Sequence, residues 1–116
     1  KKIIGEGKNK VISDNDVTSH AEINAIRDAS KNINNYRLNG CSMYVTLEPC
    51  HMCAKAAIDA RLSTIIFAAS EPKTGSIVSI DNFLDRKMLN HSVKYFHGLM
   101  EDESSSLLKK FFKLRR

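Results

Sequence analysis

Apolar residues follow two different rhythms along this chain, and each rhythm predicts a kind of secondary structure. Between residues 20 and 32 they return every three or four positions, which predicts an amphipathic helix. These positions are Ala21, Ile23, Ala25, Ile26 and Ala29. The asparagine-rich stretch 32–39, closed by Gly40, predicts the exit of this helix and a turn. Pro49 suits the start of a second helix, which we expect from residue 50 to about residue 61.

Short apolar runs on either side of these helices predict strands. Residues 43–47 are rich in β-branched and aromatic side chains, and residues 64–69 are almost continuously apolar, as in a strand covered on both faces. Two further strands are predicted at residues 2–7 and 92–96, and a helical turn at 81–84. Residues 9–19 and 71–75 are predicted to be loops. Strands that alternate with helices indicate an α/β fold, in which helices cover both sides of one sheet.

The composition is that of a single domain, and we expect residues 1–116 to fold as one unit. No apolar run approaches the ~20 residues that a membrane-spanning helix requires, so no membrane partner is expected. Two of the three cysteines form a C-x-x-C pair, which favours metal binding in a reducing compartment over a disulfide framework. We therefore expect a cytoplasmic protein. The net charge of +5 favours a polyanionic partner only weakly, since many proteins without such a partner share it.

Two short motifs supply the candidate chemistry, His20-Ala21-Glu22 and Cys50-His51-Met52-Cys53. Cys50 and Cys53 lie one helical turn apart, so both sulfur atoms can face one point, and the His20 imidazole can supply a third ligand. Three such ligands leave the fourth position of a tetrahedral zinc ion open for water, as in catalytic zinc sites. Glu22 lies about 200° around the helix from His20, off the ligand face, which suits a general acid and base beside that water.

Each of these residues also has a simpler explanation. A lone cysteine is often a small buried side chain, and a lone histidine or glutamate at a helix start often serves the helix itself. Cys41 is not expected to be a fourth ligand, because it precedes a strand and lies outside the C-x-x-C turn. His51, His91 and His97 remain candidates, and His51 ranks first. If one of them closed the site, the zinc would be structural.

The order H-x-E followed by P-C-x-x-C is the signature of zinc-dependent deaminases. Nearly the whole chain resembles the bacterial tRNA-specific adenosine deaminases of the cytidine deaminase superfamily. The resemblance lies in the segments IGEGKN (4–9), DVTSHAEI (16–23), NYRL (35–38), YVTLEPCHMC (44–53), KTG (73–75) and FFKLRR (111–116). The zinc motifs are shared across the superfamily, whereas NYRL and FFKLRR resemble the tRNA enzymes in particular.

This resemblance implies a fold, a reaction and a set of roles. The fold would be a three-layer α/β/α cytidine deaminase-like mixed sheet that lacks the first helix and first strand of the family, so we expect an N-terminally incomplete domain that is poorly stable alone. His20, Cys50 and Cys53 would bind one Zn²⁺ per subunit, Glu22 would shuttle protons, and Asn9 would hold the target nucleoside. The anticodon loop would be held by Glu71, Lys73, Phe112, Arg115 and Arg116.

The implied reaction is the hydrolysis of adenosine to inosine at the wobble position of an arginine tRNA anticodon, by a zinc-activated water in a homodimeric enzyme. Glu71 stands where the family commonly has aspartate. Residues 101–116 predict a helix with an acidic start and a basic end, which either complements the helix dipole or contacts phosphates. Two alternative functions stay open: a deaminase of free nucleosides or bases, such as cytidine or guanine, and a non-catalytic zinc-binding or RNA-binding remnant.

Overall fold

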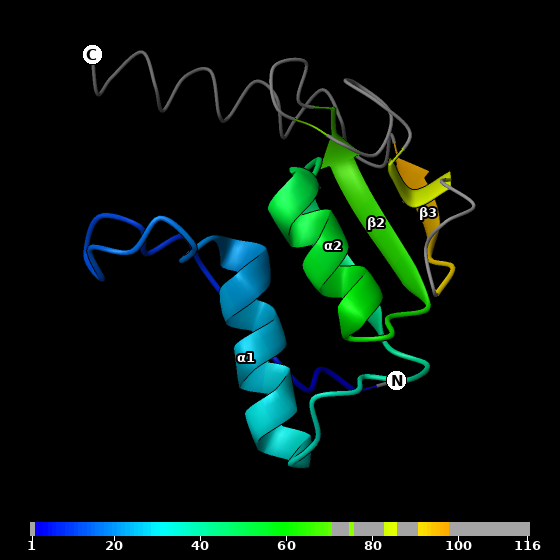
Figure 1. The fold of residues 1–116 in the computed structure, drawn as a ribbon, viewed down its shortest axis with the longest axis horizontal. Coiled ribbons are helices and arrows are strands. Elements are labelled where there is room, and N and C mark those ends of the chain that lie inside the picture. Colours follow the sequence, from blue (N-terminus) through cyan, green and yellow to red (C-terminus); the bar gives the residue numbers. More distant parts are fainter. Residues whose placement is uncertain (1, 71–74, 76–82, 86–90, 98–116) are drawn as a thin grey trace.

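The computed structural model describes residues 2–70, 75, 83–85 and 91–97. Its elements, in chain order, are α1 (Ala21–Ile33), β1 (Ser42–Leu47), α2 (His51–Asp59), β2 (Thr64–Ala69), the 3₁₀ turn η1 (Phe83–Asp85) and β3 (Lys94–His97) (Figure 1). The two predicted helices and the strands predicted at 43–47, 64–69 and 92–96 are confirmed within two residues at each end. None of the described helices is both long and apolar enough to cross a membrane.

The described strands form a three-stranded sheet in the order β1-β2-β3, with both pairs parallel. Met43 lies beside Ile65, which lies beside Tyr95, so one register runs across all three strands. The chain passes from β1 through α2 to β2, the βαβ unit that parallel neighbours require. Parallel pairing brings the carboxyl ends of these strands to one edge of the sheet, and the two cysteines of the C-x-x-C pair follow the carboxyl end of β1.

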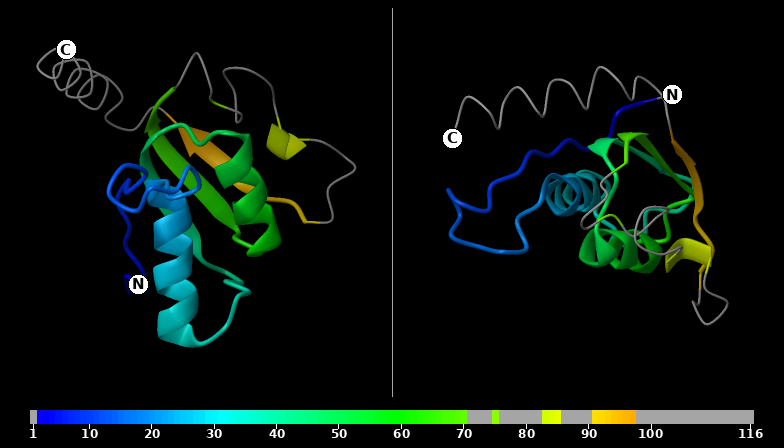
Figure 2. Two further views of the ribbon diagram at one scale, coloured as in Figure 1. Left: turned by 60° about the vertical axis from the view of Figure 1, so that its left-hand side comes forward. Right: turned by 90° about the horizontal axis from the view of Figure 1, so that it is seen from above.

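The core lies between the sheet and the two helices, which are on the same side of it (Figure 2). Ile65, Phe67 and Ala69 alternate along β2 as fully buried residues facing this core. Ala54 and Ala57 of α2 are also fully buried, and their small side chains allow the helix to lie close to the sheet. The helix predicted at residues 101–116 lies outside the described residues.

Residues 2–7 do not form the predicted strand: they pair with none of the three strands of the described sheet. Side chains of α1 supply their hydrogen-bond partners instead. The Asn32 side chain donates to the Ile4 carbonyl at 2.8 Å, and the Glu6 backbone N–H donates to an Asp28 carboxylate oxygen at 2.9 Å. The predicted strand is therefore wrong, because a strand requires a neighbouring backbone to complete its hydrogen bonds, which α1 does not offer.

Gly5 and Gly7 explain how this segment comes so close to α1. A Cβ atom added to Gly5 would lie 2.6 Å from the Ala29 backbone nitrogen, and one added to Gly7 would lie 2.3 Å from that of Ala25. No side chain fits at either position without a shift of the backbone. The glycines therefore fix the N-terminal segment against the helix that begins beside the candidate histidine ligand.

A residue in the left-handed conformation follows each helix, and the one after α1 lies in the turn that the sequence predicts. Asn34 follows α1 in the left-handed conformation, with φ of 54°, and its N–H bonds to the Lys31 and Ser30 carbonyls. Helix α2 ends at Asp59, two residues before the predicted end, because Arg61 also takes a left-handed conformation, with φ of 64°.

Candidate metal and catalytic site

The first half of the candidate site is the start of α1. His20 is the N-cap residue, with an extended backbone, and its carbonyl accepts the Asn24 N–H at 3.0 Å as α1 begins. The His20 side chain makes no capping hydrogen bond, so its imidazole is not engaged by the helix end. Before it, the Asp16 carboxylate accepts the Thr18 hydroxyl at 2.7 Å and the Thr18 N–H at 2.9 Å, which shapes the turn into the helix.

The second half is the junction between β1 and α2. Cys50 is the N-cap residue of α2, and Cys53 lies within the first turn and is buried. The two preceding residues, Glu48 and Pro49, are buried, and the Glu48 N–H donates to the Ala69 carbonyl at 2.8 Å at the end of the sheet. This bond ties the entrance of α2 to β2, so the sheet itself positions both cysteines.

The fold brings His20, Cys50 and Cys53 together, with their ligand atoms all within 4.8 Å of one another. The His20 Nδ1 atom lies 3.4 Å from the Cys53 sulfur and 3.8 Å from the Cys50 sulfur. A tetrahedral zinc ion with bonds of about 2.3 Å to sulfur and about 2.1 Å to nitrogen holds such atoms about 3.6 Å apart. The donor set and its spacing therefore fit Zn²⁺ closely.

The surroundings of Cys50 and Cys53 favour the thiolate form, which binds metal, at Cys50. A hydrogen bond from the Cys53 thiol, the nearby N–H groups of Cys53 and Met52 and the charge of His20 lower the pKa of Cys50 to about 5, against the opposing effect of burial. The same bond, together with burial and the Glu22 carboxylate, raises the pKa of the Cys53 thiol. Binding of a divalent cation at this point would displace the proton of Cys53.

Glu22 lies at this cluster without being one of its three ligand residues. Its carboxylate is close enough to the Cys53 sulfur to raise the pKa of that thiol. It is half-buried, on the second residue of α1. A carboxylate beside such a cluster is a candidate for proton transfer at the site.

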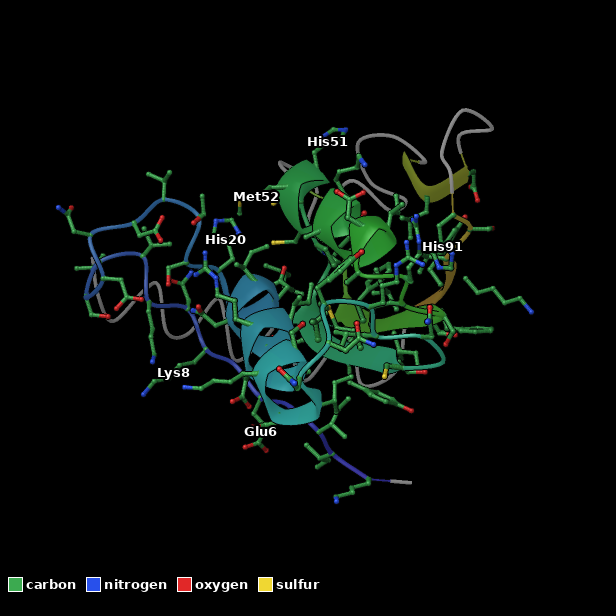
Figure 3. The ribbon with its side chains drawn as sticks, turned by 60° about the horizontal axis from the view of Figure 1, so that its bottom comes forward. Glu6, Lys8, His20, His51, Met52 and His91 are labelled. Atoms are coloured by element: carbon green, nitrogen blue, oxygen red, sulfur yellow. The ribbon has the colours of Figure 1, made fainter. Side chains whose placement is uncertain are left out.

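The other sequence candidates for a fourth ligand lie elsewhere in the described part of the chain. The Cys41 sulfur lies 3.8 Å from the Asn39 carbonyl oxygen, and His91 contacts the Leu62 carbonyl at 2.7 Å. His51 is exposed on α2, and within the residues described neither it nor His91 joins the cluster. Figure 3 shows His20 facing the first turn of α2, with His91 at the opposite side of the molecule. The side chain of His97 lies outside the described part of the structure.

The predicted RNA and nucleoside contacts are only partly within the described chain. Asn9 is exposed, and its side-chain oxygen accepts the Val11 N–H at 3.0 Å, which leaves its amide nitrogen directed to no acceptor in the described ranges. The remaining predicted contacts lie outside the described residues: Glu71, Lys73, Phe112, Arg115 and Arg116.

Two polar residues near the site were missed by sequence reasoning. Ser19 is completely buried although it is polar, and Asn24 places its carboxamide beside it. The available signal was an asparagine four residues after His20, on the helix face that the ligand shares. Polar residues at such a position are as often simply solvated, so the pattern alone did not single them out.

Comparison with known proteins now places the chain in a family. It belongs to the MafB19-like deaminase family, whose sequence profile matches residues 1–116. Among curated proteins it is similar to the tRNA-specific adenosine deaminase of Haemophilus influenzae, at 47% identity over 98% of this chain and 66% of that protein. It is also similar to the tRNA-specific adenosine deaminase of Aquifex aeolicus, at 45% identity over 98% of this chain and 75% of that protein. The chain thus spans about two thirds to three quarters of these relatives.

Solved structures give the same fold. One, from a study of A-to-I editing by tRNA:A34 deaminases at the wobble position of transfer RNA, matches with a TM-score of 0.87 and 39% identity, over 91% of this chain and 77% of that one. A guanine deaminase from Nitrosomonas europaea matches with a TM-score of 0.77, over 90% of this chain and 63% of that one, but at 22% identity it shows the fold alone. The predicted cytidine deaminase-like α/β fold is confirmed.

Proposed function

We propose that this protein deaminates adenosine to inosine by hydrolysis at the wobble position of a tRNA anticodon, with an arginine tRNA as its substrate. The observation that carries the reaction type is the cluster of His20, Cys50 and Cys53, with Glu22 beside it. Three N and S donors at zinc-like spacing and an adjacent carboxylate match the set with which zinc deaminases remove an amine from a base by hydrolysis.

The residues divide the chemistry between them. His20, Cys50 and Cys53 would hold Zn²⁺, which when bound supplies a water activated for attack on carbon. The reaction forms a C–O bond at C6 of adenine, breaks the C6–N bond and releases ammonia. Glu22 would take one proton from the attacking water and pass it to ring N1, and would then move the second proton of that water from the new C6 hydroxyl to the departing amine, which leaves as ammonia. Glu22 lies in the first turn of α1, so one carboxylate beside the cluster would serve both steps.

The choice of substrate depends on the relatives, because the zinc motif does not distinguish one base from another. The curated relatives at 45–47% identity are named tRNA-specific adenosine deaminases. The surface is compatible with a polyanion: a shallow groove of about 570 Å³ beside α1 carries four basic and two acidic side chains. It is lined by Glu6, Gly7, Lys8, Lys10, Asn24, Arg27, Asp28 and Lys31. An unpaired anticodon loop also makes it inexpensive to extrude a base into the site.

The remaining assignments follow from the same proposal. Asn9 would hold the nucleoside, and Glu71, Lys73, Phe112, Arg115 and Arg116 would hold the anticodon loop. The protein would act in the cytoplasm as a homodimer with one Zn²⁺ per subunit. Light scattering of the purified protein tests the dimer, and metal analysis tests the ratio of zinc to protein.

The decisive experiment incubates the full-length protein with an arginine anticodon stem-loop and reads adenosine-to-inosine conversion by sequencing. The matched variant is Glu22→Gln, which keeps the shape of the side chain and removes its ability to accept a proton. We expect inosine at the wobble position with the native protein, and a loss of at least about 100-fold in rate with Glu22→Gln. Zinc content should be equal in the two proteins, since Glu22 is not among the clustered ligand residues.

A zinc-loaded, folded dimer that forms no inosine on any anticodon stem-loop would contradict the proposal. Free adenosine, cytidine and guanine belong in the same assay, because conversion of one of them instead would identify a deaminase of free nucleosides or bases. Equal rates for the native protein and Glu22→Gln would show that Glu22 does not transfer the proton.

A further inference from the structure

A small polar network joins the start of α1 to the N-terminal segment, and none of the chemistry described above uses it. At its centre is Ser19, which is completely buried. A buried hydroxyl requires partners, and Ser19 has them on both sides. Its hydroxyl donates to an Asp14 carboxylate oxygen at 2.8 Å and accepts from the Asn24 amide nitrogen at 3.0 Å.

Asn24 connects three parts of the chain through one carboxamide. Its amide nitrogen lies 2.9 Å from the Lys8 carbonyl and 3.3 Å from the Ser19 carbonyl, in addition to the Ser19 hydroxyl. The Ser19 carbonyl also accepts the Lys10 N–H at 2.8 Å. Asn24 therefore holds residues 8–10, the end of the loop and the first turn of α1 in one arrangement.

The two segments that Asn24 joins contain residues of the candidate site. Ser19 directly precedes His20, the candidate nitrogen ligand, and Lys8 directly precedes Asn9, the proposed nucleoside contact. The Asn24 backbone N–H donates to the His20 carbonyl at 3.0 Å as well. Both the side chain and the backbone of Asn24 therefore restrain residues next to the reacting groups.

We propose that Asn24 is a positioning residue, which fixes the His20 ligand and the Asn9 segment relative to each other through Ser19 and Lys8. The part of this inference that concerns Asn9 rests on the proposed function, whereas the effect of Asn24 on metal binding does not. Partners that orient a ligand typically change metal affinity 10–100-fold when they are removed, because the ligand must then be ordered on binding. Asn24 restrains the backbone of His20, so we expect removal of its side chain to change zinc affinity by about 10-fold, the lower end of that range.

The chemistry of the network explains why the residue is asparagine. Two carbonyl oxygens and a hydroxyl oxygen face the amide group, so the position requires a donor. Aspartate has the same shape but brings acceptor oxygens against two carbonyls and near the Asp14 carboxylate. Alanine removes the donor and leaves a cavity beside the buried Ser19.

Asn32 offers a matched control on the same helix. Its side-chain amide donates to the Ile4 carbonyl at 2.8 Å, so it makes the same kind of bond, from α1 to the same N-terminal segment. It lies eight residues further on, about 12 Å along the helix axis from Asn24. Asn32→Ala should therefore lose a similar amount of stability without any effect on His20.

The experiment compares the native protein with Asn24→Ala, Asn24→Asp and Asn32→Ala. Zinc affinity is measured by competition with a coloured chelator, and the geometry of the site by the visible absorption bands of the Co²⁺-substituted protein. We expect Asn24→Ala and Asn24→Asp to bind zinc about 10-fold more weakly and to shift the Co²⁺ bands. Asn32→Ala should match the native protein in both measurements. On the stem-loop, Asn24→Ala should raise KM and lower kcat, whereas Asn32→Ala should change neither.

Native zinc affinity and a native Co²⁺ spectrum in Asn24→Ala would overturn the inference and leave Asn24 a merely structural residue. An equal loss in Asn24→Ala and Asn32→Ala would overturn it as well. If Asn24→Ala does not fold, Ser19→Ala gives the answer, since it removes the hydroxyl link and leaves the bond from Asn24 to Lys8. The metal measurements need no substrate, so weakened zinc binding in a protein without deaminase activity would support the positioning role while the proposed function fails.

Discussion

Substitution of Gly7 by alanine should destabilise this protein, although the same change stabilises many proteins. In an unstrained position, alanine in place of glycine stabilises by about 0.4–1 kcal/mol, because it restricts the unfolded chain. At Gly7 the added Cβ would lie 2.3 Å from the Ala25 nitrogen and 2.4 Å from the Ala21 carbonyl oxygen. Non-bonded atoms are most stable at separations of about 3.5–4.0 Å, so residues near Gly7 would have to retreat from α1 by at least about 1 Å.

The size of the loss in the free energy of unfolding follows from the packing and hydrogen bonding that this displacement of residues near Gly7 disturbs. Extra atoms forced into a packed position cost about 1–3 kcal/mol, and the adjoining bond from Asn24 to the Lys8 carbonyl, now 2.9 Å, would lengthen. We therefore expect Gly7→Ala to lower the free energy of unfolding by about 1–3 kcal/mol, well beyond the entropic gain.

Urea unfolding followed by circular dichroism measures this difference, with Gly40→Ala as the comparison. Gly40 has φ of 76° but no atom within 4 Å of an added Cβ, so its substitution tests backbone strain without a clash. Gly7→Ala should be the more damaging change, and it alone should weaken zinc binding. A neutral or stabilised Gly7→Ala variant would refute the packing of residues 2–7 against α1.

Three further predictions follow from the site and its surroundings. Removal of zinc by a chelator should lower the unfolding midpoint, because a ligand at 100 times its Kd stabilises by about 2.7 kcal/mol; an unchanged midpoint would exclude a folded-state metal site. Hydrogen bonds from Thr18 lower the pKa of Asp16, so their contribution to stability is present above about pH 4 and is lost as the pH falls through the lower, folded-state pKa. The stability difference between the native protein and Asp16→Asn, measured in urea at pH 6 and pH 2.5, should therefore shrink at the lower pH. Finally, Arg27→Ala with Lys31→Ala should reduce the slope of log K against log[salt] for stem-loop binding, by about 0.7–0.9 for each phosphate that the variant no longer neutralises. Lys55→Ala, which removes a lysine paired with Asp59 on α2, should leave that slope unchanged.

Local sequence determined both helices, three of the four predicted strands and the chemistry of the candidate ligands. Apolar periodicity predicted α1, because one face of the helix must be buried whatever lies against it, and Pro49 indicated the start of α2. The C-x-x-C spacing predicted that Cys50 and Cys53 face one point, since a helical turn is set by the backbone and not by distant contacts. The same spacing rule does not fix the Glu22 carboxylate, because His20 is the N-cap residue with an extended backbone, and the carboxylate interacts with the Cys53 thiol.

Tertiary structure alone decided which of these local elements meet. His20 and Cys50 are 30 residues apart, and only the packing of α1 beside α2 brings their side chains to 3.8 Å. Residues 2–7 read as a strand from their pattern, yet a strand exists only where another backbone completes its hydrogen bonds, and here α1 takes that place. The spacing of Asn24 from His20 did not single it out, because its partners at Lys8 and Ser19 are set by how the N-terminal segment crosses the helix. A pattern in the sequence reports what one segment needs to bury or bind, whereas the fold determines which other segment meets that need.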